Sequence, residues 1–159
     1  RLQRQEIQKG QTHPEYYFTW IPSAIHICTA SEETQTAAKI SERLQVPLDI
    51  VKQQLRWLEN RGLVRNQQGH WLYESGNLHL PAESPLVCMH HHNWRTRAVL
   101  DAQNFRDENV HFTGVYSVSH IARKNLKELM LQFLTSFNAL AGPSKPEDVV
   151  CLTCDFFPI

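Results

Sequence analysis

Residues 36–73 read TAAKISERLQVPLDIVKQQLRWLENRGLVRNQQGHWLY and decide the fold that we expect for the first half of the chain. The pattern predicts a short helix ending near Leu44, a four-residue turn, and a second helix over residues 49–61. Gly62 is expected to end the second helix, and two short apolar runs flank the sequence NQQG at 66–69 as the arms of a small hairpin. This order of elements is typical of a winged helix-turn-helix.

The second predicted helix has two different faces. At 100° per residue, its apolar side is expected to pack against the preceding helix. Its other side carries ammonium, guanidinium and amide groups, which suit the guanine and adenine edges of the major groove. A solvated surface helix would carry similar residues, but the neighbouring helix, turn and hairpin favour a DNA-reading surface. The apolar side comprises Ile50, Val51, Gln54, Leu55, Trp57 and Leu58, and the polar side comprises Asp49, Lys52, Gln53, Arg56 and Asn60.

Positive charge gathers in the same stretch. Residues 36–65 hold six basic and three acidic side chains, a net +3, whereas the whole chain of 159 residues has a formal net charge of +0. Such a patch can hold a few phosphates, with an affinity that is weak per monomer and sensitive to salt, and a dimer would double it. The expected base contacts to duplex DNA are Lys52, Gln53, Arg56 and Asn60, and the expected phosphate contacts are Lys39, Arg43, Arg61, Arg65 and, in the hairpin, His70.

Several local signals refine these boundaries. Residues 1–12 are polar and are expected to be a linker or the end of an upstream part. Residues 12–15, THPE, resemble a helix-capping box, and we expect a helix to follow with a break at Pro22, which lacks an N–H. Gln45 stands where such turns often use glycine, so it is expected to adopt a left-handed conformation. Pro47 leaves the second helix without an obvious side-chain cap.

The composition changes near Pro81, in a stretch rich in Pro, Gly, Asn and Ser. We therefore place a winged helix-turn-helix domain at residues 13–80 and a second domain, for dimerisation or sensing, at residues 81–159. The expected fold class is α+β, with the winged helix followed by a small helix–strand–helix–strand domain. The predicted elements of the second domain are a helix over 86–105, a strand over 111–117, a helix from Ser119 to Gly142 and a strand over 149–157.

Two strands make a poor sheet on their own. The last predicted helix also has a longer apolar stripe than two strands easily cover. Both features favour a homodimer through the second half, and a monomer with a well-covered sheet is the alternative. An unknown small molecule or protein is a possible effector of this half.

Histidine and cysteine side chains suggest a metal site but do not complete one. Cys88 and His92 are four residues apart on a predicted helix and could supply two ligands. The three consecutive histidines at 90–92 point about 100° apart and cannot all reach one ion. Cys151 and Cys154 lie on opposite faces of a predicted strand and are expected to be buried core residues. We therefore expect no metal.

Other function classes find no support in the sequence. No apolar run approaches the roughly 20 residues that a membrane-spanning helix needs, and no signal peptide opens the chain. No phosphate-binding loop, dinucleotide fingerprint, nucleophile elbow or paired carboxylates are present. We expect a cytoplasmic, non-catalytic protein without a cofactor.

Four stretches are similar to one protein family. They are YYFTW at 16–20, KISERL at 39–44, LRWLENRGLV at 55–64 and DFFPI at 155–159. On these motifs the chain resembles the DUF4423-type family, an uncharacterised bacterial family of winged-helix transcriptional regulators. The resemblance implies a winged helix followed by an α+β domain and a regulatory role, and it implies no ligand or catalytic residues. The alternative function is a protein-interaction or ligand-sensing module that reuses a winged helix without binding DNA.

Overall fold

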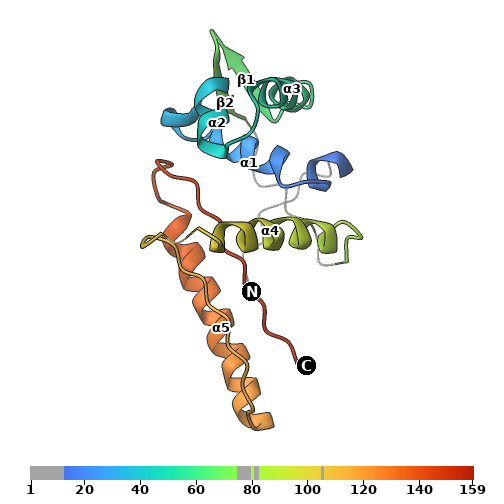
Figure 1. The fold of residues 1–159 in the computed structure, drawn as a ribbon, viewed down its shortest axis with the longest axis vertical. Helices are drawn as coiled ribbons and strands as arrows, with labels where there is room; N and C mark the ends of the chain where they lie inside the picture. Colours follow the sequence, from blue (N-terminus) through green and yellow to red (C-terminus); the bar gives the residue numbers. More distant parts are fainter. Residues whose placement is uncertain (1–12, 75–79, 81–82, 105) are drawn as a thin grey trace. The chain divides into compact units, whose positions relative to one another are not determined.

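The computed structural model describes residues 13–74, 80, 83–104 and 106–159, which form a mixed α+β structure (Figure 1). The predicted linker at 1–12 and the predicted boundary at Pro81 lie outside the described residues. The chain divides into two compact units. The first unit contains the described residues of 13–101 together with 146–153, and the second unit contains those of 102–145 and 154–159.

The first unit opens with two short helices in place of the one interrupted helix that the sequence predicts. A 3₁₀-helix, η1, spans Pro14–Tyr17, and α1 spans Ile21–Cys28. The interruption falls at residues 18–20, just before the kink or break predicted at Pro22, and Pro22 lies in the first turn of α1, where an N–H would have no helical partner. The predicted capping box depends on Thr12, which lies outside the described residues, and the His13 side chain at the start of η1 does not cap the helix.

The next two helices follow the predicted pattern closely. A short 3₁₀ turn, η2 (Glu32–Thr34), precedes α2 (Ala37–Leu44), and the Thr36 hydroxyl caps α2 by accepting from the backbone N–H of Lys39 at 3.3 Å. Gln45 has φ 54°, which confirms the predicted left-handed turn. Helix α3 spans Leu48–Glu59 and starts after Pro47 without a side-chain cap, as predicted.

Gly62 and a tight hairpin follow α3. Gly62 has φ 68°, and the N–H of Leu63 donates to the carbonyl oxygen of Leu58 at 3.0 Å, which closes the helix end. Strands β1 (Val64–Gln67) and β2 (His70–Tyr73) pair antiparallel, with Gln67 opposite His70. The turn is therefore Gln68–Gly69, and both residues have positive φ, as a two-residue hairpin loop requires.

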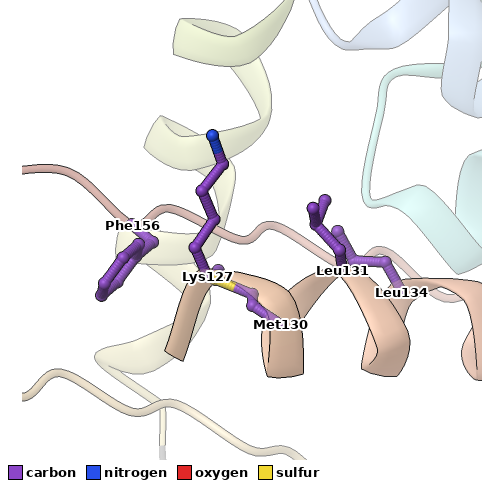
Figure 2. A pocket seen from close by; sticks show the side chains of 5 residues that line it. All are labelled: Lys127, Met130, Leu131, Leu134 and Phe156. Atoms are coloured by element: carbon purple, nitrogen blue, oxygen red, sulfur yellow. The ribbon is translucent and has the colours of Figure 1, made fainter. Parts of the chain in front are cut away.

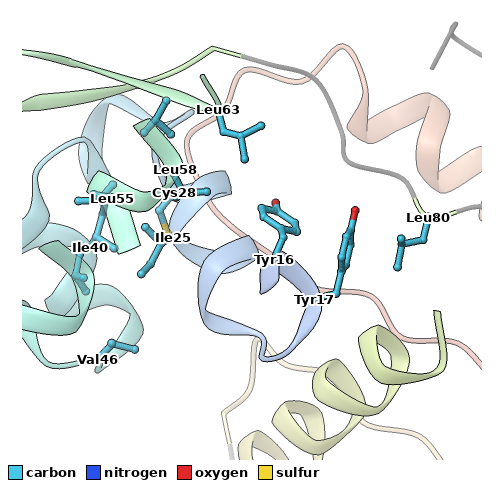
Figure 3. Packing of buried hydrophobic residues seen from close by; sticks show 12 residues of the cluster. Tyr16, Tyr17, Ile25, Cys28, Ile40, Val46, Leu55, Leu58, Leu63 and Leu80 are labelled. Atoms are coloured by element: carbon cyan, nitrogen blue, oxygen red, sulfur yellow. The ribbon is translucent and has the colours of Figure 1, made fainter. Parts of the chain in front are cut away.

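One hydrophobic core holds α1, α2, α3 and β1 together (Figure 3). Its centre is fully inaccessible to solvent, and each of the three helices contributes to it. Leu80 extends the cluster at its edge, and Leu86, Val87 and Val149 pack against it. The core side chains with no exposed surface are Ile25, Cys28, Ile40, Val51, Leu55 and Leu58.

Two longer helices complete the structure. Helix α4 spans Val87–Ala102, inside the predicted range of 86–105, and Phe105 lies outside the described residues. The side-chain amide of Asn93 on α4 donates to the carbonyl oxygen of Tyr17 at 2.8 Å. Helix α5 spans His120–Ala141, and the Ser119 hydroxyl caps it at the N–H of Ala122, as predicted.

The two strands predicted for the second half are wrong. Residues 111–117 and 149–157 have no regular secondary structure, and the described residues contain only the β1–β2 sheet. Their residue types suit a strand, but β-propensity expresses packing against a neighbouring strand, and neither stretch pairs with one. Cys151 is exposed and Cys154 is half-buried, so the predicted core role of these thiols is also wrong. Among the described helices, none has the length and apolarity to cross a membrane.

Candidate nucleic-acid interface

Helix α3 separates its apolar and polar side chains onto opposite faces. Val51, Leu55 and Leu58 are fully buried in the core. The four side chains predicted to meet DNA bases all lie on the exposed face: Lys52, Gln53, Arg56 and Asn60. Within the described part of the chain, neither Lys52 nor Arg56 forms an ion pair. This face therefore offers charged and amide donors to an external ligand.

Arg61, at the end of α3, is held by its own helix. Its guanidinium lies 3.9 Å from the centre of the Trp57 ring, and Nη1 donates to the Trp57 carbonyl oxygen at 3.3 Å. The Nε atom is buried and finds no hydrogen-bond partner among the described residues. Cation–π contact and burial limit how far this side chain can reach toward a phosphate.

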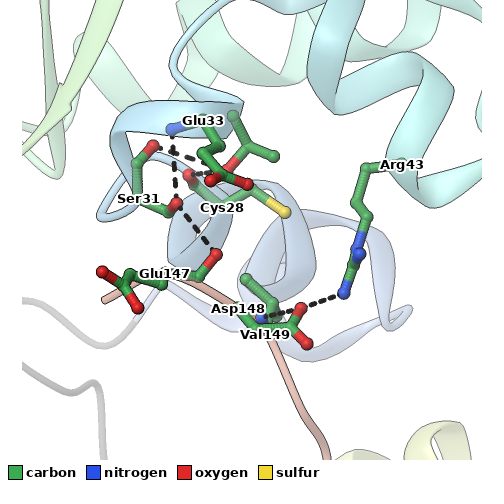
Figure 4. Close-up of polar contacts among 8 residues, drawn as sticks. Cys28, Ser31, Glu33, Arg43, Glu147, Asp148 and Val149 are labelled. Carbon is green, nitrogen blue, oxygen red and sulfur yellow. Dashed lines mark hydrogen bonds and ion pairs between the residues drawn. The ribbon is translucent and has the colours of Figure 1, made fainter. Parts of the chain in front are cut away.

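The predicted phosphate contacts on α2 differ from each other in their surroundings. Lys39 is exposed, and no ion pair of the described residues includes it. Arg43 forms an ion pair through Nη2 with the carboxylate of Asp148 (Figure 4). The two residues of that pair are 105 positions apart in the sequence, so no local sequence pattern predicts the ion pair.

The hairpin carries the remaining two predicted contacts. Arg65 Nε donates to Glu74 Oε1 at 2.5 Å, and both side chains lie at the surface. His70 is exposed beside the Gln68–Gly69 turn. The carboxylate of Glu59 accepts the Asn66 N–H at 3.1 Å and so ties the hairpin to the end of α3. The structure thus places the nine predicted residues on α2, on α3, in the turn directly after α3 and on the hairpin, and it engages Arg43, Arg61 and Arg65 within the chain.

A buried histidine, which sequence reasoning missed, fixes the base of the hairpin. His26 on α1 is 1% exposed, and its ring stacks on Tyr73 of β2 with centroids 4.4 Å apart. Its Nε2 lies 3.1 Å from the Leu63 carbonyl oxygen, and its Nδ1 lies 2.9 Å from the Tyr16 hydroxyl. A carbonyl can only accept, so Nε2 carries the proton and Nδ1 accepts from the Tyr16 hydroxyl.

This arrangement requires the neutral imidazole. Burial lowers the pKa of His26 to about 4, against the smaller opposing effect of its hydrogen bond to Leu63. Burial also raises the pKa of Tyr16, which keeps its hydroxyl protonated as a donor. The available signal was the histidine inside the apolar run AIHIC at 24–28, a pattern typical of a hydrogen-bonded core histidine.

The possible metal ligands do not assemble. Cys88, His91 and His92 are exposed on α4, and the His90 ring meets the Tyr17 ring edge-on at 5.4 Å. In the described residues, no group of three or more His, Cys, Asp or Glu side chains could hold a metal ion.

The second unit contains a small open pocket beside α5 (Figure 2). It is mostly apolar, with the Lys127 ammonium as its charged group. Its volume of about 190 Å³ is below the roughly 300–1,000 Å³ of most ligand sites, so the pocket alone does not suit a larger effector. Its lining consists of Lys127, Met130, Leu131, Leu134 and Phe156.

Comparison with known proteins identifies a family. A family model described as "Domain of unknown function (DUF4423)" matches residues 1–159, the full length of the chain. No curated protein and no solved structure matches the chain.

Proposed function

The chain belongs to the DUF4423 family, a domain of unknown function, and we propose that this member is a DNA-binding transcriptional regulator that reads duplex DNA through α3. The observation that carries this proposal is the division of α3 into a fully buried apolar face and an exposed face of Lys52, Arg56 and amide side chains. The elements α2, turn, α3 and hairpin correspond in order to a winged helix-turn-helix, with α3 as the recognition helix.

The dimensions of α3 suit the major groove. An α-helix with its side chains is about 10–12 Å in diameter, which fits a groove about 12 Å wide. The twelve residues of α3 extend for about 18 Å at about 1.5 Å per residue. Lys52 and Arg56 lie one turn apart and can donate to guanine O6 and N7. Gln53 and Asn60 offer the paired donor and acceptor that recognise adenine.

Within the described residues, only some of the predicted phosphate contacts are free to support binding of α3 in the major groove. Lys39 and His70 are exposed on α2 and the hairpin, on either side of α3 in the chain. Arg43 and Arg65 already hold carboxylates, so a phosphate must replace those partners. We therefore expect weak binding per monomer, with a strong dependence on salt.

We further propose that a second copy of the chain covers α5. No residue of this helix is buried, and Leu129, Phe133 and Leu140 are 61%, 49% and 80% exposed. Five exposed rings among the described residues of the second unit (Phe112, Tyr116, Phe133, Phe156 and Phe157) present on the order of 600 Å² at roughly 150–250 Å² per ring. With the aliphatic side chains added, this surface reaches the scale of the roughly 800 Å² that each partner of a stable interface buries.

Selection of bound sequences from random duplex DNA tests the regulator function. The wild-type chain is expected to enrich a defined motif at low salt, and the double variant Lys52→Ala/Arg56→Ala is expected to lose it with at least a tenfold loss of affinity. Arg123→Ala/Lys124→Ala is the matched control, because it removes one arginine and one lysine from exposed positions of α5. Equal retention of DNA by the two double variants would refute recognition through α3.

One observation favours a second candidate function, a protein-interaction module that does not bind DNA. The net charge of the chain is +0, and three of the six basic side chains in residues 36–65 are engaged within the chain. Absence of any enriched motif at the lowest salt, with the fold intact by circular dichroism, would support this function instead.

A further inference from the structure

The return segment, residues 146–153, belongs to the first unit, although the residues on both sides of it belong to the second unit. The Ser31 hydroxyl donates to the Glu147 carbonyl oxygen at 3.4 Å. Val149 packs against the hydrophobic core. Between these contacts, the Asp148 carboxylate forms its ion pair with Arg43 of α2 (Figure 4). The return segment thus contacts α2 at one of the predicted phosphate contacts, Arg43.

The Asp148 carboxylate makes the kind of contact that a DNA phosphate would make. A guanidinium forms charge-assisted hydrogen bonds with carboxylate and phosphate alike. The backbone N–H of Val149 donates to the same carboxylate oxygen at 2.7 Å and so fixes its orientation toward Arg43. A phosphate that approaches Arg43 must therefore displace a negative charge that also repels it.

The contact is suited to exchange. The side chains of Arg43 and Asp148 are 48% and 65% exposed. Ion pairs between such exposed groups are weak, so the pair can open without unfolding of the core. Lys39 lies one turn before Arg43 on α2 and is exposed, so an arriving phosphate meets a positive charge close to the pair.

On the premise of the proposed function, we propose that the return segment is an intramolecular competitor of DNA for Arg43. Arg43 holds Asp148 in the free protein and exchanges it for a phosphate when DNA binds. Because the chain continues from both ends of the return segment into the second unit, a ligand or second copy that displaces the segment changes the availability of Arg43. This gives the second unit a route by which it controls DNA affinity.

The variant Asp148→Asn tests this competition in the full chain. Binding to short mixed-sequence duplex DNA is measured by fluorescence anisotropy over a series of salt concentrations. The variant is expected to bind about three- to tenfold more tightly at low salt, because no carboxylate has to leave Arg43, and its log–log salt dependence should stay close to that of the wild type, because both complexes hold the same number of phosphates. Replacing Arg43 by Ala in the same variant should remove the gain in affinity and reduce the salt dependence by about one unit.

Asp107→Asn is the matched control, because it removes the same charge from an exposed position of the second unit. It is expected to change affinity less than about twofold and to leave the salt dependence unchanged. If Asp148→Asn behaves like Asp107→Asn while Lys52→Ala/Arg56→Ala still abolishes binding, the competitor is refuted and recognition through α3 stands. If neither the wild type nor Asp148→Asn binds DNA at the lowest salt, both proposals fail.

Hydrogen exchange provides a measurement that needs no variant. Addition of duplex DNA to the wild-type chain is expected to speed exchange of the backbone amides in residues 146–153 relative to those of the core helices. Exchange in this segment that stays equal or slows on saturation with DNA would refute the competition.

Discussion

Helices α3 and α5 are both amphipathic, but only α3 buries its apolar face within the described chain. Val51, Leu55 and Leu58 of α3 are fully buried, whereas Leu129 and Leu140 of α5 are mostly exposed. The difference lies in their neighbours, because α1, α2 and β1 surround α3, while α5 buries no residue. The comparison shows that apolar spacing along a helix indicates a face that packs against something. It does not indicate whether the same chain or another chain covers that face.

The largest expected effect separates the two helices directly. Leu55→Ala should lower the free energy of unfolding by about 2–5 kcal/mol at every protein concentration, because it leaves a cavity in the core. Leu129→Ala should cost less, and its effect should grow with protein concentration if a second copy covers α5. Urea unfolding at several concentrations, with light scattering for the molar mass, measures both. A monomer whose stability ignores concentration would refute the proposed dimer.

A second test concerns the histidine at the base of the hairpin. The pKa of His26 is about 4 in the folded chain and about 6.5 when unfolded, so between these values the unfolded chain binds more protons. The stability due to neutral His26 is therefore complete above about pH 6.5 and falls by about 3 kcal/mol as the pH drops to about 4. Urea unfolding over this range measures it. His26→Asn should be less stable at pH 7, and its free energy of unfolding should depend less on pH between about 4 and 6.5. An equal pH dependence in both proteins would contradict the prediction.

The smallest expected effect concerns the turn between α2 and α3. Gln45 has φ 54°, a conformation that glycine adopts without strain. Gln45→Gly should therefore raise the free energy of unfolding by up to about 1 kcal/mol, which a small increase in the thermal midpoint would show. The hydrogen bond from Gln45 Nε2 to the Glu42 carbonyl oxygen opposes this gain. Gln68→Gly in the hairpin turn is the comparison, and a clear loss of stability in Gln45→Gly would show that the hydrogen bond outweighs the strain.

Local signals predicted the first unit well. Gln45, Gly62 and the sequence NQQG at 66–69 each determine a helix end or a turn through their own backbone chemistry. The buried face of α3 followed from its periodicity. These features depend on residues within a few positions of each other, which is why a single sequence contains them.

Contacts between distant residues were beyond such signals. The pair Arg43–Asp148 depends on the path by which the chain returns to the first unit. The stretches 111–117 and 149–157 have strand-forming residues but no neighbouring strand among the described residues, and residue propensity alone does not predict whether a neighbour is present. The contact of Arg61 with Trp57 was within reach, since the two residues are four positions apart and the predicted helix included both. Sequence reasoning therefore named the candidate residues, but it did not predict which of them form contacts with other residues of the chain.

The path of the return segment means that the first unit is assembled from two separate pieces of chain. No single cleavage site would release it whole. A recombinant fragment that stops at Asp101 would lose Val149 from the edge of the core and would leave Arg43 without Asp148. Such a fragment would present a more positive surface than the parent protein, and under the proposed competition it would bind DNA more tightly than the intact chain.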